Sequence, residues 1–354
     1  MEQSTLSRNN KQVGTWLLIG VAMIIVQVMI GGITRLTESG LSITEWKPIT
    51  GMLPPLNDAA WQVEFDKYRS TDQFKYVHQH FSLSDFKFIF FWEWFHRVWA
   101  RLLGIVFLVG FIYFVVTKKL NKQMIVPMII LFLLGALQGL VGWIMVKSGL
   151  VPEKFYVGHV ELTTHLMAAI VLLAYTAWFA FGLLPGMHKK VGQTNLRPYL
   201  LSLGFFLVIQ LIYGGFMAGL KAATTAPTWP DINGSFLPGD LLEQSPMLQN
   251  FVNNPIMVHF MHRGLAYGIL IFTIIYFFEA RKIIGHRLFT TLSAWLVGLI
   301  SLQVVLGILT VVNATNNTAL AWLGVTHQFV AMLIVLCLLA LLFLIKRPTL
   351  IRAR

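Results

Sequence analysis

The stretch that decides the fold runs from residue 88 to residue 116 and reads FIFFWEWFHRVWARLLGIVFLVGFIYFVV. It is longer than the roughly 20 apolar residues that cross a bilayer as a helix, yet it contains Glu93, His96 and Arg97. Because its apolar residues are continuous and do not alternate, we predict a helix and not a strand of a β-barrel. Ionisable side chains are costly inside a spanning helix and usually functional, so the same stretch holds candidate site residues.

Further stretches of this kind recur along the chain, and the whole sequence predicts eight spanning helices. They cover residues 14–33, 88–116, 124–146, 158–182, 199–220, 256–279, 288–312 and 320–345. Only 12% of the 354 residues are charged, about half of the share that is usual in soluble domains. The chain is therefore predicted to be an all-α integral membrane protein.

The basic residues predict its orientation. The N-terminus, the turns after the second, fourth and sixth predicted helices, and the C-terminus each contain at least two Lys or Arg. The shorter loops on the other side contain only Lys147, Lys154 and Lys221. By the positive-inside rule, both termini are cytoplasmic and the two long loops are extracytoplasmic. The net charge of +12 then belongs to the cytoplasmic face, so we expect the lipid bilayer, and no nucleic acid, as a partner.

The chain also contains an internal repeat, because four motifs recur in the same order in its two halves. The matched motifs are Gln27, Gly31 and Gly32 with Gln210, Gly214 and Gly215; His96-Arg97 with His262-Arg263; Gln138 and Gly142 with Gln303 and Gly307; and Thr164-His165 with Thr326-His327. Each half has an even number of spans, so the copies share one orientation, as in parallel repeats.

The repeat predicts two four-helix bundles. The expected organisation is a cytoplasmic N-terminus (1–13), a first bundle (14–182) that includes the long extracytoplasmic loop 34–87, a cytoplasmic linker (183–198), a second bundle (199–345) and a cytoplasmic tail (346–354).

Four of the ten histidines occupy equivalent positions in the repeat, namely His96, His165, His262 and His327. A neutral imidazole is a standard axial ligand of heme iron, and two facing helices can hold a porphyrin inside a bundle. A lone histidine in a span more often forms an interhelical hydrogen bond. Four at matched depth favour heme iron, with His96 paired with His165 and His262 paired with His327.

The remaining histidines and the cysteine have simpler interpretations. His159 and His259 lie near the outer membrane surface and are expected to form interfacial hydrogen bonds, or, for His259, to support His262 from one helical turn away. Four others are expected to be solvated: His78, His80, His188 and His286. The only cysteine, Cys337, precludes an intramolecular disulfide and is interpreted as a packing residue.

Glu93 distinguishes the two halves of the repeat, since its counterpart is His259. It precedes His96 by three residues, so both project from one face of the helix. A carboxylate beside a porphyrin can transfer protons or stabilise a developing positive charge. The alternative is an ion pair with Arg97 or Arg101, which we consider the weaker interpretation.

Two arginines directly follow candidate ligands. Arg97 and Arg263 are expected either to pair with heme propionates or to form structural ion pairs, and the sequence leaves both roles open. Arg35 follows a glycine pair at the membrane surface, where it is expected to snorkel or to meet an acidic group.

With these residues identified, the chain resembles the heme A synthase family over nearly its whole length. The resemblance is strongest in residues 31–42, GGITRLTESGLS, in residues 44–48, TEWKP, and in residues 93–97, EWFHR. It implies successive hydroxylation of the heme O methyl group to the formyl group of heme A, for cytochrome oxidase biogenesis. It also implies a heme b cofactor bound by His262 and His327, and a substrate heme O site around His96 and His165 with Arg97 nearby and Glu93 in catalysis.

The resemblance also bears on location and partners. It implies the bacterial cytoplasmic (inner) membrane, an electron acceptor that it leaves unidentified, and heme O synthase and other oxidase assembly factors as partners. Some family members have a cysteine pair in an extracytoplasmic loop, so this chain is similar to the cysteine-free branch.

Two other classes of protein are alternatives to the enzyme. A b-type cytochrome that transfers electrons between quinol and a partner fits the repeat and the histidines equally well. Glu93 in one half and the first-loop sequence favour the enzyme. A repeat-built transporter is disfavoured because such proteins place polar groups at the midplane, whereas these histidines are off-centre.

Overall fold

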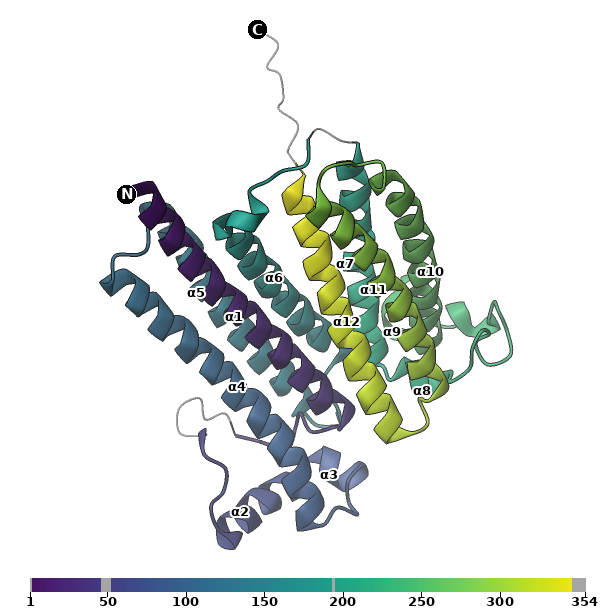
Figure 1. Ribbon diagram of the computed structural model, residues 1–354. Coiled ribbons are helices and arrows are strands. Elements are labelled where there is room, and N and C mark those ends of the chain that lie inside the picture. The colour runs from purple at the N-terminus through teal and green to yellow at the C-terminus, as the bar shows by residue number, and fades with distance from the viewer. Residues whose placement is uncertain (1, 46–51, 193–194, 346–354) are drawn as a thin grey trace.

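A computed structural model of the chain describes residues 2–45, 52–192 and 195–345 (Figure 1). Eight of the described helices are long and apolar enough to cross a membrane, which confirms the predicted number. They are α1 (Glu2–Leu36), α4 (Leu83–Val116), α5 (Lys122–Gly149), α6 (His159–Leu183), α7 (Leu196–Gly219), α10 (Pro255–Ala280), α11 (Arg287–Val312) and α12 (Asn317–Leu344). Each predicted span coincides with one of them, although α1 begins at Glu2 and not at residue 14.

Polar caps determine where the two helices with His-Arg motifs begin. Ser82 and Asp85 form a capping box at the start of α4, in which each side chain accepts from the other residue's backbone N–H. Asn254 caps α10 by accepting from the N–H groups of Ile256 and Met257, and Pro255 occupies the first helical position, where no N–H is needed. These caps fix the starting points from which the site residues are placed.

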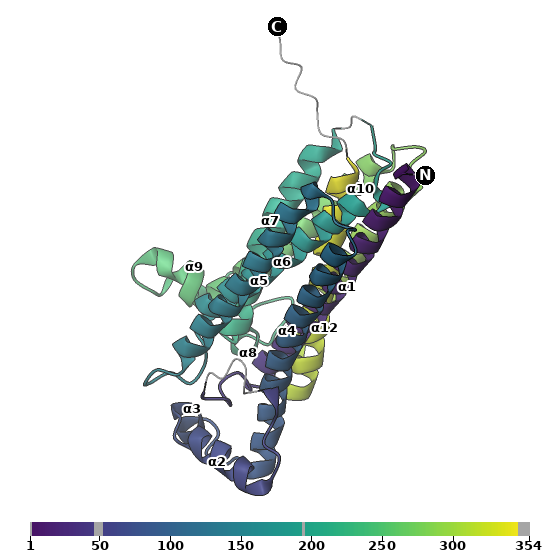
Figure 2. The ribbon, with the colours of Figure 1, turned by 90° about the vertical axis from the view of Figure 1, so that its left-hand side faces the viewer.

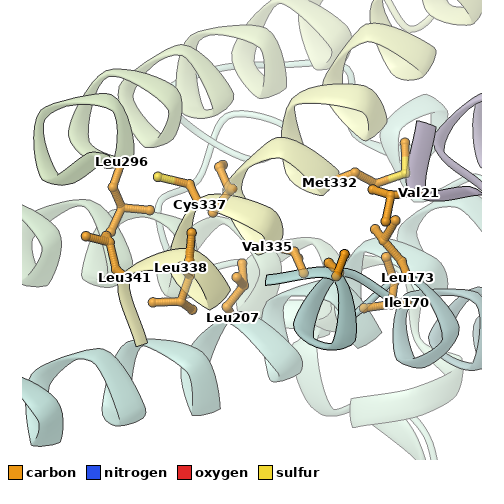
Figure 3. Packing of buried hydrophobic residues seen from close by; sticks show 14 of the residues in the cluster. Val21, Ile170, Leu173, Leu207, Leu296, Met332, Val335, Cys337, Leu338 and Leu341 are labelled. Atoms are coloured by element: carbon orange, nitrogen blue, oxygen red, sulfur yellow. The ribbon is translucent and has the colours of Figure 1, made fainter. Parts of the chain in front are cut away.

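The core lies between the halves, where α1, α6, α7 and α12 meet. α6 and α12 bury the largest shares of their spans and α4 the smallest. Figure 3 shows Val21 of α1, Leu173 of α6 and Leu207 of α7 near the α12 side chains that pack against them. Cys337 of α12 is buried in this cluster, as expected for a packing residue.

Two glycines seat the halves against each other. A Cβ added to Gly32 of α1 would overlap Gln328 of α12, and one added to Gly215 of α7 would overlap Thr163 of α6. Small residues of this kind let helix backbones approach closely. Gly32 and Gly215 are equivalent in the repeat, so these contacts support the predicted relation between the halves. The division into two parallel four-helix bundles stays a prediction.

The start of α1 and the end of α12 lie at one end of the helices, and the long connections lie at the other (Figures 1 and 2). The first connection forms α2 (Asp58–Arg69) and α3 (Asp72–Tyr76), and the second includes α8 (Ala222–Thr225) and α9 (Asn250–Asn253). An aromatic cluster including Phe65 and Phe86 fixes α2 to the start of α4. The described residues of the first loop after position 51 are therefore folded against the start of α4.

Folding of this loop makes one prediction wrong. His78 is buried, with Nδ1 2.7 Å from the Tyr68 hydroxyl and Nε2 3.1 Å from the Glu38 carboxylate. We expected a solvated histidine because the loop is polar in sequence. The packing of α2 and α3 removes His78 from water, whereas His80 is exposed as predicted.

His286 was also expected to be solvated, and this too is wrong. Its side chain is buried and caps α11, with Nδ1 accepting from the Phe289 N–H at 3.1 Å and Nε2 2.8 Å from the Lys189 carbonyl oxygen. The residue therefore joins two connecting segments. His188 is exposed as predicted.

A polar link joins the first loop to the second half of the chain. Glu38 forms an ion pair with Lys221 and a hydrogen bond with His78. Burial raises the pKa of Glu38, but these hydrogen bonds and the charge on Lys221 outweigh it and lower the pKa to about 2. Arg35 donates to the Ala218 carbonyl at 2.7 Å. It therefore caps the end of α7, and the charge of Glu38, an acidic group of the kind expected, also acts on it.

Candidate functional site

The four repeated histidines are seated in the same way, each against a glycine on the preceding spanning helix. A Cβ added to Gly31 of α1 would lie 3.0 Å from Cε1 of His96 on α4. At the equivalent position in the second half, a Cβ on Gly214 of α7 would lie 3.5 Å from Cε1 of His262 on α10. A Cβ at position 31 would therefore crowd the His96 ring, whereas one at position 214 would make an ordinary van der Waals contact with His262.

The other two histidines repeat this arrangement. A Cβ on Gly142 of α5 would lie 2.7 Å from Cε1 of His165 on α6, and one on Gly307 of α11 would lie 3.2 Å from Cε1 of His327 on α12. The repeated glycines are thus packing positions. The structure shows which side chains they pack against.

In the second half, the structure brings the predicted ligand pair together. The ring centroids of His262 and His327 are 6.4 Å apart, with an angle of 61° between the planes. Two imidazoles on opposite sides of one metal, each bound at about 2.0 Å through nitrogen, have centroids about 6 Å apart. The separation of this pair therefore fits axial ligation of one iron.

Unsatisfied buried atoms support the same fit. Within the described ranges, Nδ1 of His327 and Oε1 of Gln303 are buried and have no hydrogen-bond partner. Such groups are rare in proteins and call for a missing partner. Neutral imidazoles in an apolar bundle are also the donor set that heme iron takes. The residues present thus fit a bis-histidine heme.

Glu93 lies in the first half, and the structure satisfies both of its carboxylate oxygens. Oε1 accepts from Nη2 of Arg97 at 2.5 Å, in an ion pair four residues apart. Oε2 accepts from the Ser42 hydroxyl at 2.7 Å and from the Ile43 N–H at 2.8 Å. The side chain of Glu93 is only 4% exposed. The carboxylate thus joins the start of the first loop to α4, beside His96.

The ion pair makes another interpretation wrong, because we had considered pairing between Glu93 and Arg97 the weaker alternative. Residues four apart are neighbours on a helix face, and a buried carboxylate is costly unless it is paired. Arg97 is only 15% exposed itself. Pairing therefore offsets the desolvation of both groups.

Arg97 and Arg263 both donate hydrogen bonds to backbone carbonyl oxygens of a loop. Arg97 donates to the carbonyl oxygens of Ile43 at 3.2 Å and Glu45 at 3.4 Å. Arg263 donates to the carbonyl oxygens of Thr228 at 2.5 Å and Asp231 at 2.8 Å. Each arginine thus holds the loop that follows the first helix of its own half. These bonds are structural, and pairing with propionates stays a prediction.

His259 occupies the position of Glu93 in the second half, and it also contacts the arginine four residues on. Its Nε2 accepts from Nε of Arg263 at 2.9 Å, and its ring is fully buried. His259 thus forms a hydrogen bond, as expected, and its partner is Arg263 on the same helix; the alternative, support of His262, stays a prediction. His159 forms the expected hydrogen bond, 3.1 Å from Oδ1 of Asn253.

Sequence reasoning missed two sets of site residues. It gave no role to Ser42, although this residue lies in the most distinctive stretch of the first loop. It also treated Gln27, Gln138 and Gln210 only as markers of the repeat, whereas each contacts a repeated histidine. The signal was present, because each glutamine precedes the glycine that seats that histidine by four residues.

Eight helices that can cross a membrane, with four similarly seated histidines between them, define a multi-pass membrane protein. The sequence profile of the COX15-CtaA family, described as cytochrome oxidase assembly protein, matches residues 14–339. The chain therefore belongs to this family, and the resemblance to heme A synthases is confirmed.

Curated relatives agree along nearly the whole chain. A heme A synthase from Flavobacterium johnsoniae is 39% identical over 333 residues, covering 92% of this chain and 95% of the relative. Heme A synthases from Parvibaculum lavamentivorans and Rhodospirillum centenum are 39% and 38% identical and cover 90% and 96% of this chain, and 90% and 89% of their own lengths.

Proposed function

We propose that this protein oxidises the methyl group of heme O to the formyl group of heme A by successive hydroxylation, for cytochrome oxidase biogenesis. One observation carries the proposal. A buried carboxylate, Glu93, lies on the same helix face as one of four similarly seated histidines, and the equivalent position in the other half is a histidine. A duplicated heme scaffold with this asymmetry suits one reacting porphyrin and one that is only bound.

In this proposal the first half binds the substrate and the second half binds the cofactor. The substrate heme O would be held between His96 and His165 in the first half, where Arg97 binds carbonyl oxygens of the first loop. A heme b cofactor is bound by His262 and His327 in the second half, with Arg263 in the equivalent place. When bound, heme b supplies reversible one-electron transfer.

Glu93 acts as a fixed negative charge. Its two oxygens accept from Arg97, Ser42 and Ile43, so no carboxylate oxygen is left without a donor. A preorganised charge of this kind stabilises positive charge that develops on a substrate. These three donors occupy three of the roughly four acceptor sites of the carboxylate, and such fixed bonds favour the electrostatic role over proton transfer.

Arg97 and Arg263 are also the residues that we propose to bind the carboxylates of the porphyrins. Each directly follows a ligand candidate and holds loop carbonyls at the same end of the helices. A propionate would add a charge-assisted bond to this set.

The charge pattern supports a location. We place the protein in the bacterial cytoplasmic (inner) membrane with both termini in the cytoplasm, because the turns after α4, α6 and α10, which contain basic residues, lie at the end of the helices where α1 begins. Heme O synthase and other oxidase assembly factors are the expected partners, together with an electron acceptor of unassigned identity.

Heme extraction and chromatography test the activity directly. Cells that make heme O are compared with and without this protein, and we expect heme A or its hydroxylated intermediate only when the protein is present. A membrane that gains heme b but neither product would support the alternative, a b-type cytochrome without heme modification.

A further inference from the structure

The first helix of every spanning pair carries a glutamine one turn before the glycine that seats a histidine. These residues are Gln27, Gln138, Gln210 and Gln303. We propose that they position the axial imidazoles, each by accepting the Nδ1–H of its histidine so that Nε2 is directed at the porphyrin. The proposal rests on the proposed function, because it takes the four histidines as heme ligands.

The contact is closely matched between the two halves. Nε2 of Gln27 lies 3.1 Å from both ring nitrogens of His96 and donates to the His96 backbone carbonyl at 3.2 Å. Nε2 of Gln210 lies 3.2 and 3.4 Å from the ring nitrogens of His262 and donates to its carbonyl at 3.1 Å. Near-equal distances to two ring nitrogens place each amide over the ring.

The contact recurs in the other helix pair of the first half. Nε2 of Gln138 lies 3.3 and 3.4 Å from the ring nitrogens of His165 and donates to its carbonyl at 3.2 Å. Three of the four histidines thus have a glutamine amide against the imidazole, and each ring also packs on the glycine four residues further along.

The acceptor half of each amide has no donor. Oε1 of all four glutamines is buried and has no hydrogen-bond partner in the described part of the chain. A buried amide oxygen without a donor is costly, and a fourfold occurrence at equivalent positions indicates a shared partner. At the fourth position the complementary atom is also unsatisfied, because Nδ1 of His327 has no partner either.

Ligand chemistry supplies the missing donor. An imidazole bound to iron through Nε2 carries its hydrogen on Nδ1, and such ligands almost always donate it to an acceptor that fixes the ring and raises its basicity. The last torsions of glutamine and of histidine are both broad. Turning the amide and rotating the imidazole from beneath it together direct Nδ1–H at Oε1. The glutamine then loses its hydrogen bond to the histidine backbone carbonyl and gains one from Nδ1–H. The carbonyl lies within a helix and keeps its helical hydrogen bond.

The reduction potential of heme b distinguishes this role from mere packing. We compare purified wild-type protein with Gln210→Glu and Gln210→Leu by spectroelectrochemical titration and by the electron paramagnetic resonance of the oxidised heme. A charged acceptor strengthens the ligand and lowers the potential, whereas loss of the acceptor raises it. We expect the ratio of oxidised to reduced heme at a fixed potential to change about tenfold in opposite directions, or about 59 mV each way.

The repeat offers a matched control. Gln27→Glu makes the same change in the first half and should leave the potential of heme b unchanged. If Gln210→Leu does not fold, the pair Gln303→Glu and Gln303→Leu tests the same prediction through His327.

Two results would overturn the inference. Heme b that is retained with shifts of the same sign in both variants, or with no shift, shows that the glutamines only pack. Wild-type protein without heme b would instead overturn the proposed function on which the inference depends.

Discussion

Replacing Glu93 with glutamine removes the charge that faces Arg97 but keeps the length and shape of the side chain. The pair is buried, with side chains 4% and 15% exposed. Breaking a buried ion pair costs about 3–5 kcal/mol, because the remaining charge loses its partner. Arg97 keeps its bonds to the carbonyls of Ile43 and Glu45, so we expect the lower end, about 3 kcal/mol of unfolding free energy.

The assay is reversible unfolding in mixed micelles, run as a double-mutant cycle with Glu93→Gln, Arg97→Gln and the double variant. The double variant should be less destabilised than the sum of the single variants, with a coupling energy of about 2 kcal/mol. As a control, Glu279→Gln removes an exposed ion pair with Lys282, whose side chain is 69% exposed, and should cost less than about 1 kcal/mol.

Additive effects at positions 93 and 97, within about 0.5 kcal/mol, would refute the reasoning. They would mean that the ion pair contributes no stability of its own. The proposal that Glu93 is a fixed charge would then lose its support.

Further predictions concern a glycine seat and a loop carboxylate. Gly142→Ala places a Cβ 2.7 Å from Cε1 of His165 and should lower heme A formation at least about tenfold by displacing the ring. Gly139→Ala on the same helix meets no atom within 4 Å and should leave heme A formation unchanged, with stability up to about 1 kcal/mol higher; equal activities would contradict this account. Because the folded-state pKa of Glu38 is lowered to about 2, its contribution to stability is present above its ordinary pKa and is lost as pH falls toward 2. Glu38→Gln should therefore cost about 2 kcal/mol at neutral pH and progressively less below pH 4 in thermal unfolding, and a loss independent of pH would show that the ion pair with Lys221 is not its origin.

The spanning helices and the ligand candidates could be predicted from sequence because their signals are local. Continuous apolar length identifies each span, and the repeat identifies His96, His165, His262 and His327 together without reference to the fold. The predicted span began at residue 88, whereas α4 begins at Leu83. Sequence patterns rarely resolve a difference of this size at the end of a helix.

The polar contacts could not be predicted, because they depend on how the loops fold back. The four-residue spacing of Glu93 and Arg97 is visible in the sequence. The other two donors to the Glu93 carboxylate, Ser42 and Ile43, come from a loop that is distant in sequence. His78 likewise lies in a polar stretch of sequence that predicts a solvated side chain, but the packing of α2 and α3 buries it. Tertiary packing decided in each case which of two local interpretations holds.

The central claim is that the two histidine pairs have different tasks, and heme content of purified variants tests it most directly. Heme b per chain and heme A formation are measured in His96→Ala, His165→Ala, His262→Ala and His327→Ala. We predict that the first two variants keep heme b and lose heme A formation, whereas the last two lose most of the heme b. Retention of heme b in both second-half variants, with its loss in the first-half variants, would contradict the assignment of the halves.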